Sequence, residues 1–355
     1  MSGRHNENTE HNKRLKSEGN PRYRLTEDEA DIVLSYRRIK EEAEKEGLDP
    51  KSVHSGWIKN KHASLYFKND TSKKERDKFL KDLLDSYKQH APNYTKIYYD
   101  KSNNNHLLVL DPADIHIGKI ANEIETGQNY DSQEAVLRVI TGLNSILSKC
   151  KGFFINRICL VMGNDVLHYD TPNKTTKGTQ VDSDGLTWYE CFLMAKRLYV
   201  QVIETLLSVA PVHAVYCPSN HDYQSSFFLA QCIEAHFKNC KDISFDNSPS
   251  YRKYLAYENN LLGFTHGDKA KHNDLPLLMA TEAAHLWAKC DRRYIYTHHI
   301  HSKFSKDYLN VCVESLRSPS PADSWHHQNG YLNSPAVEGY LHNKNGQIAR
   351  ITHFF

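Results

Sequence analysis

The sequence lacks three features that would assign it to a large class of proteins at once. None of its eight cysteines forms a CxxC pair, and most lie in apolar runs, so we expect buried thiols in a reducing cytoplasm rather than a disulfide framework. No apolar run approaches the roughly 20 residues that span a bilayer, and no membrane association is expected. The formal net charge is only +2, so a basic surface for nucleic acid must come from local clustering. What remains is a chain of 355 residues with enough apolar content for a sizeable core.

The first 93 residues differ in composition from the rest. Residues 1–22 carry almost no apolar side chains, and we expect a disordered tail there. Residues 23–93 are predicted to form a small, mainly helical extension. Its first helix starts at a capping box made by Thr26 and Glu29 and ends near Gly47.

A second helix is expected within residues 48–61, with Trp57 and Ile58 on its apolar side, which allows a helix-turn-helix hypothesis. The stretch from Lys51 to Lys81 holds nine basic and three acidic residues, and another amphipathic helix is expected at 72–90. Such lysines can contact phosphates, with nearby aromatic rings available for stacking. A solvated helical face explains the same composition, so the role of this region stays open.

From about Ile97 onward, apolar strand-like runs alternate with helical segments, which predicts an α/β layered domain at residues 97–355. The expected strands are Leu107–Leu110, Ile158–Met162, Val212–Cys217, Asn260–Thr265, Tyr294–Thr297, Tyr308–Glu314, Val337–Leu341 and Ile348–Phe354. The expected helices are Ser132–Cys150, Gly185–Val209, Ser225–Asn239 and Leu275–Lys289. Ligands of α/β sheets bind beyond the carboxyl ends of the strands, so the residues that follow the first five strands are the candidates for a site.

Five short polar motifs occupy those positions. They are Asp114-Ile115-His116, Gly163-Asn164-Asp165-Val166-Leu167-His168, Asn220-His221-Asp222, His266-Gly267-Asp268 and His298-His299-Ile300-His301. No single motif decides much, but their order and their repeated position after an apolar run predict a two-metal phosphoesterase site.

The donor atoms of these motifs are imidazoles, carboxylates and one amide, with no thiolate. The candidate metal ligands are Asp114, His116, Asp165, Asn220, His266, His299 and His301. Such a set suits two divalent ions and favours Mn²⁺, with Fe or Zn²⁺ as alternatives, and it does not match an all-oxygen calcium shell. The spacing i and i+2 in Asp114/His116 and His299/His301 lets both side chains turn toward one ion.

The segment from about Leu107 to His301 resembles the calcineurin-like metallophosphoesterases, and this resemblance implies a β-sandwich flanked by helices. The second motif is similar to the GGDLFH-type motif of the nucleases that process DNA double-strand breaks. Phosphoprotein phosphatases carry an arginine just after this motif, and none stands there in this chain. The general look of the chain, chiefly residues 56–59 and 175–179, is similar to metallophosphoesterases encoded by phages and prophages, which often carry such an N-terminal extension, and this would place the protein in the host cytoplasm.

This resemblance implies a role for each candidate residue. Asp114, His116 and His301 would bind one metal, and Asn220, His266 and His299 the other, with Asp165 bridging the two. His221 would be the catalytic histidine facing the scissile phosphate, and His168 matches the second histidine of the nuclease branch. Asp222 or another nearby carboxylate is a candidate for orienting His221.

Three positions depart from the family pattern of small residues at tight turns. Asn164, Ser219 and His298 stand where glycine is usual. A positive φ is expected to suit Asn164 best, Ser219 less well and His298 least.

Two further segments are weaker candidates. His326 and His327 match no motif, and we expect a surface loop or a wall of the substrate site there rather than a third metal position. The hydroxyls and lysines of residues 170–180 can hold a phosphate backbone, although a solvated loop has the same composition.

The sequence therefore supports three hypotheses about function. The first is a metal-dependent phosphodiesterase acting on nucleic acid, with DNA favoured, that uses a metal-bridging hydroxide. The second is a phosphatase or a phosphodiesterase of small molecules, and the third is a non-catalytic scaffold that binds nucleic acid. The sequence is compatible with either a monomer or a homodimer.

Overall fold

The computed structural model describes residues 105–176 and 179–355, two short strands near the N-terminus and a few single positions. These are β1 (Ser55–Lys59), β2 (Ser64–Lys68), Glu41, Lys78, Lys81 and Asp82. The chain divides into two units, Met1–Ser86 and Tyr87–Phe355, and each is described by itself.

The two described strands of the first unit form a β-hairpin. β1 pairs antiparallel with β2, and Trp57 lies opposite Tyr66. Aromatic and β-branched residues favour extended backbone, and Trp57 and Ile58 follow that preference. The helix expected here, and with it the second helix of the helix-turn-helix hypothesis, is wrong. The tail at 1–22 and most of the other two expected helices lie outside the described residues.

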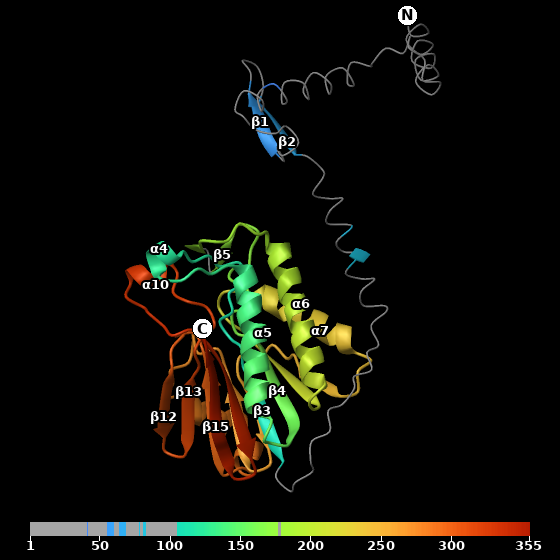
Figure 1. Cartoon of the computed structure of the whole chain (residues 1–355), viewed down its shortest axis with the longest axis vertical. Coiled ribbons are helices and arrows are strands. Elements are labelled where there is room, and N and C mark those ends of the chain that lie inside the picture. The colour runs from blue at the N-terminus through green and yellow to red at the C-terminus, as the bar shows by residue number, and fades with distance from the viewer. Residues whose placement is uncertain are drawn as a thin grey trace, which may run out of the picture. The chain divides into compact units, whose positions relative to one another are not determined.

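The second unit contains two sheets (Figure 1). The first has six strands in the order β15-β14-β3-β4-β7-β8. Its strands are β3 (His106–Leu110), β4 (Ile155–Gly163), β7 (Val212–Cys217), β8 (Ile243–Asp246), β14 (Ala336–Asn343) and β15 (Gly346–Phe354). β3, β4, β7 and β8 are parallel, so the carboxyl ends of these four strands meet at one edge. β14 and β15 form the expected hairpin.

The second sheet has five strands in the order β12-β13-β11-β10-β9. Its strands are β9 (Lys253–Tyr257), β10 (Asn260–Phe264), β11 (Arg292–Thr297), β12 (Phe304–Tyr308) and β13 (Val311–Ser315). β10, β11 and β13 are parallel. The strand expected at Tyr308–Glu314 corresponds to β13 but begins only at Val311, because a tight turn at Leu309, with φ 57°, leaves Tyr308 at the end of β12.

Helices cover the outer faces of both sheets. α5 (Ser132–Lys149), α6 (Trp188–Leu207) and α7 (Tyr223–Phe237) pack on the six-stranded sheet. α8 (Leu275–Glu282) and α9 (Ala284–Trp287) pack on the five-stranded sheet, in place of the single helix expected at Leu275–Lys289. Two short helices, α4 (Glu123–Thr126) and α10 (Ser324–Gln328), lie side by side in Figure 1.

The two-residue period of the strands builds this layered packing. On β3, Leu107 and Val109 enter the core between the sheets, and Leu108 and Leu110 enter the core beneath the helices. The predicted α/β class and the β-sandwich flanked by helices are confirmed. All eight cysteines are free thiols, and five of them are buried. Among the described helices, none has both the length and the apolar character that crossing a bilayer requires.

Candidate metal and catalytic site

The seven predicted ligands all lie on loops that follow the carboxyl ends of β3, β4, β7, β10 and β11. Parallel pairing aligns those ends within each sheet, and the packing of the two sheets brings the loops together. Three groups of side chains result, and within each of them one nitrogen or oxygen atom from every member lies within 4.8 Å of the others. Two groups consist of predicted ligands, Asp114 with His116 and His301, and Asp165 with His266 and His299. The third is His116 with His168 and His221.

The first group is fully buried and has two neutral imidazoles. The Nε2 atoms of His116 and His301 lie 3.3 Å apart, and the His301 Nε2 is 3.4 Å from Oδ1 of Asp114. Burial lowers the pKa of His116 well below its usual value and also lowers that of His301, although Asp114 opposes the second shift. Burial acts to raise the pKa of Asp114, but His301 lowers it to about 2. This carboxylate is charged while both imidazoles keep a lone pair.

The second group is centred on His266. Its Nε2 lies 3.1 Å from Oδ2 of Asp165 and 2.9 Å from Oδ1 of Asn220, so all three atoms converge. Burial opposes a charge on His266, but the Asp165 carboxylate raises its pKa to about 9. His299 is more exposed, and its pKa is lowered by burial and by the neighbouring His266.

This donor set fits divalent cations. Neutral imidazole nitrogens and carboxylates are the ligands that Mn²⁺, Fe and Zn²⁺ take, and here both types point toward shared positions. The proton that His266 holds beside Asp165 occupies a place that a cation would take instead. Asp165 Oδ1 also accepts a hydrogen bond from the His221 backbone amide, at 2.8 Å, which fixes the carboxylate's orientation.

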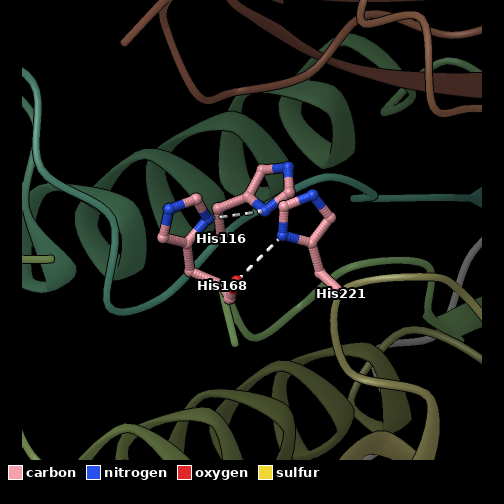
Figure 2. Close-up of side chains that lie close together, drawn as sticks. All are labelled: His116, His168 and His221. Atoms are coloured by element: carbon pink, nitrogen blue, oxygen red, sulfur yellow. Dashed lines mark hydrogen bonds between the residues drawn. The ribbon is translucent and has the colours of Figure 1, made fainter. Parts of the chain in front are cut away.

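His168 and His221 lie beside His116 of the first group (Figure 2). The Nδ1 of His221 donates to the backbone carbonyl of His168 at 2.8 Å, so Nε2 is the ring nitrogen that remains available to a substrate. The Nδ1 atoms of His168 and His116 are 3.4 Å apart. Burial and the neighbouring His221 lower the pKa of His168 well below its usual value. A neutral His168 is therefore placed to accept the Nδ1 proton of His116 and to orient that ring.

The Asp222 carboxylate accepts hydrogen bonds from the neighbouring loops and does not contact the His221 ring nitrogen that it was expected to orient. Its Oδ2 accepts from the Leu167 amide at 2.8 Å, and its Oδ1 accepts from the Ser219 hydroxyl at 2.6 Å. The Ser219 hydroxyl oxygen in turn accepts from the Asp165 amide at 2.7 Å. The expectation that Asp222 orients His221 is wrong, because the group that binds the His221 Nδ1 is the His168 carbonyl.

The backbone of the site adopts left-handed conformations that side chains with a Cβ rarely take. Among the described residues nine non-glycine positions have positive φ, and six of them belong to the site motifs. These six are Asp114, His116, Asn164, Asp165, His299 and His301. The expectation for Asn164 is confirmed with φ 54°, whereas Ser219 and His298 do not have positive φ. The His298 Nε2 instead lies 3.0 Å from the buried Asp111 carboxylate.

A cavity of about 640 Å³ opens over this site and is lined by His116, Asp165, His168, His221, His299 and His301. The loop after β13 supplies its other wall through Asp323, Trp325, His326 and Tyr331. The expectation of a substrate wall at His326 is met in its geometry, since the ring stacks on His301 with centroids 5.4 Å apart. Trp325 and Tyr331 were missed, and the only sequence signal was their position in the polar loop around His326.

Residues 170–180 give a mixed result for the phosphate-contact hypothesis. Gln180 lines the cavity, but several of the candidate polar groups already have partners within the protein. Thr176 donates to the Asn220 carbonyl at 2.9 Å, and Lys174 donates to the Ser183 hydroxyl at 2.6 Å. The described part of this loop therefore supports the neighbouring loops of the site.

Comparison with known proteins gives only distant structural likenesses. No family model matches the chain, and no curated protein matches it. An archaeal phosphodiesterase matches at 10% identity and a TM-score of 0.33, over 70% of this chain and 99% of its own. Vps29 from Chaetomium thermophilum matches at 11% identity and 0.33, over 70% and 98%. A predicted phosphoesterase from Streptococcus pneumoniae matches at 9% and 0.28, over 71% and 98%. Scores this low do not bear on activity.

Proposed function

We propose that this protein is a metal-dependent phosphodiesterase of the calcineurin-like metallophosphoesterase type that hydrolyses nucleic acid, with DNA the favoured substrate. The observation that carries the proposal is the convergence of two groups of metal-binding side chains under one cavity, with His221 beside them. Asp114, His116 and His301 would hold one ion, and His266, His299 and Asn220 the other. Asp165 would bridge them, and Mn²⁺ is the favoured metal.

Bound divalent ions would lower the pKa of a water molecule and neutralise charge on the phosphate. The protein's own side chains do the rest. The His221 ring donates its Nδ1 proton to the His168 carbonyl, so its Nε2 is the nitrogen left to face the leaving oxygen, and the imidazolium form of the ring would transfer its Nε2 proton to that oxygen. His168 keeps the His116 ring in place.

A panel of substrates tests this function. The purified full-length protein with Mn²⁺ is given bis-p-nitrophenyl phosphate, p-nitrophenyl phosphate, and linear single- and double-stranded DNA and RNA. We expect cleavage of the chromogenic diester and of at least one DNA. Hydrolysis of the monoester alone would reject a phosphodiesterase, and no turnover of any substrate would favour the scaffold hypothesis.

The N-terminal unit is proposed to add affinity for nucleic acid through its basic stretch. Removal of residues 1–86 should weaken DNA binding most at low salt, because phosphate contacts release counterions, while hydrolysis of the chromogenic diester persists. If the protein with and without residues 1–86 binds DNA with equal affinity at every salt concentration, this unit does not contribute to substrate binding.

A further inference from the structure

Two large aromatic rings stand exposed at the rim of the cavity. Trp325 is 61% exposed and Tyr331 is 60% exposed, and both line the same cavity as His221 and His301. Their ring centroids are 5.8 Å apart, with 30° between the planes. Rings of this size bury a large apolar area when a partner covers them, so a planar group is the natural occupant.

The rim is held in place by a buried ion pair. The Asp323 carboxylate caps α10 by accepting from the His326 amide at 2.9 Å, and it lies 3.3 Å from the Lys119 ammonium. Lys119 also donates to the Ser320 hydroxyl and the Pro321 carbonyl. The Tyr331 amide donates to the His326 carbonyl at 2.8 Å, which closes the loop behind α10. The two exposed rings therefore sit on an ordered support.

One stacked and one edge-to-face ring contact connect this rim to the candidate metal ligands. The His301 and His326 rings lie 5.4 Å apart with 21° between their planes, and the Trp325 ring is 5.1 Å from that of His326. Only the His326 ring therefore separates His301 from Trp325, so a nucleotide whose phosphate lies at His301 can place its base against the aromatic rim. None of the described residues that line this cavity is lysine or arginine, so the rim suits an uncharged planar group better than a second phosphate.

We propose that Trp325 and Tyr331 bind the nucleobase next to the scissile phosphate by stacking, so that the substrate enters the site as an unpaired nucleotide. This inference rests on the proposed nucleic-acid phosphodiesterase function and specifies its substrate. A base in a duplex is already stacked on its neighbours, whereas a single-stranded base can lie on an aromatic ring. One base–aromatic stack is worth about 10- to 100-fold in binding.

Dinucleotides give the sharpest test because each has one phosphodiester bond. The rate constant kcat/KM is measured with Mn²⁺ for thymidylyl-thymidine and for two analogues that lack either the 5′ or the 3′ base. For the wild-type protein we expect one analogue to be cleaved about 10- to 100-fold more slowly than the parent. Trp325→Ala should slow the parent by a similar factor and leave that analogue unchanged, whereas Trp325→Phe should keep most of the rate.

Trp188→Ala is the matched control, because Trp188 is exposed and does not line the cavity. Equal rates for all three dinucleotides, or an unaffected Trp325→Ala variant, would overturn the inference and leave the proposed function intact. If the wild-type protein cleaves the chromogenic diester but no dinucleotide or DNA, the proposed function fails and the inference fails with it.

A binding measurement in EDTA separates stacking from catalysis. Single-stranded DNA should quench tryptophan fluorescence of the wild-type protein, and this quenching should fall in the Trp325→Phe variant. A duplex of the same sequence should quench less. Equal quenching by the duplex, or quenching unchanged in Trp325→Phe, would contradict stacking of an unpaired base on this ring.

Discussion

Two regions of the sandwich domain gather buried histidines and charged side chains, and they are built in opposite ways. Between the two sheets, donors face acceptors. Glu338 lies 2.5 Å from Arg350 and 2.9 Å from Arg317, and His342 lies 2.7 Å from the Tyr296 hydroxyl. At the strand ends, several acceptor atoms converge on one position, as where the Nε2 atoms of His116 and His301 lie 3.3 Å apart beside the Asp114 carboxylate.

The difference indicates what each region is for. A polar cluster whose members satisfy one another stabilises the fold by itself. A cluster of lone pairs and carboxylates that point at common positions requires an added positive charge. Changes at the strand ends should therefore cost activity and metal binding, and changes between the sheets should cost stability.

The largest effect is expected at Asp165. Asp165→Ala should lower turnover of the chromogenic diester by roughly 10⁴-fold, because several kcal/mol of charge stabilisation are lost with the proposed bridge. The rise in Tm on adding Mn²⁺ should shrink as well, since fewer ions bind the native state. Turnover, metal content and thermal unfolding measure this, with the exposed Asp307→Ala as the control. A fully active Asp165→Ala variant that still binds its metals would show that Asp165 is not a metal ligand.

His221 should affect rate without affecting the metals. His221→Ala is expected to slow cleavage of DNA by about 10²- to 10⁴-fold, the usual contribution of a general acid. The loss should be smaller for a p-nitrophenyl diester, because that leaving group needs no proton. His213→Ala, at a half-buried histidine bonded to Ser244, serves as the control. A fall in metal content, or the same loss on both substrates, would contradict a proton-donor role.

The sequence predicted that the motif residues gather at one site, because strand ends can be located from apolar runs and the motifs follow directly. It predicted the five strands that carry the site, and the ends of β7 (Val212–Cys217) agree residue for residue. It missed β8 and β9, which are short and only partly buried. The hairpin at Trp57 was missed because a short run that contains aromatic residues fits either a helix or a strand. The partners of Ser219 and Asp222 depend on tertiary contacts that no local pattern encodes.

Between the sheets, Glu338 should matter for stability. Glu338→Ala leaves the half-buried Arg350 and Arg317 without their shared carboxylate and is expected to cost about 3 kcal/mol of unfolding free energy. Glu282→Ala removes a more exposed partner of Arg252 and should cost no more than about 1 kcal/mol. Urea unfolding measures both variants. If both substitutions lower the free energy of unfolding equally, then burial does not determine how much the Glu338 ion pairs stabilise the fold.

His342 gives the smallest effect and a pH signature. Burial lowers its pKa to about 3, so the folded protein keeps the ring neutral. The unfolded chain binds a proton near pH 6.5, and stability is therefore lost as the pH falls below that value. At pH 5 the free energy of unfolding is lower by about 2 kcal/mol, from 1.36 kcal/mol for each pH unit.

The Gln side chain of the His342→Gln variant cannot titrate. Between pH 7 and pH 5 the unfolding free energy of this variant should fall by about 2 kcal/mol less than that of the wild-type protein. Urea unfolding at both pH values measures this, with the exposed His327→Gln expected to follow the wild type. If His342→Gln also follows the wild type, acid sensitivity originates elsewhere, and the contrast between the two regions would not extend to this histidine.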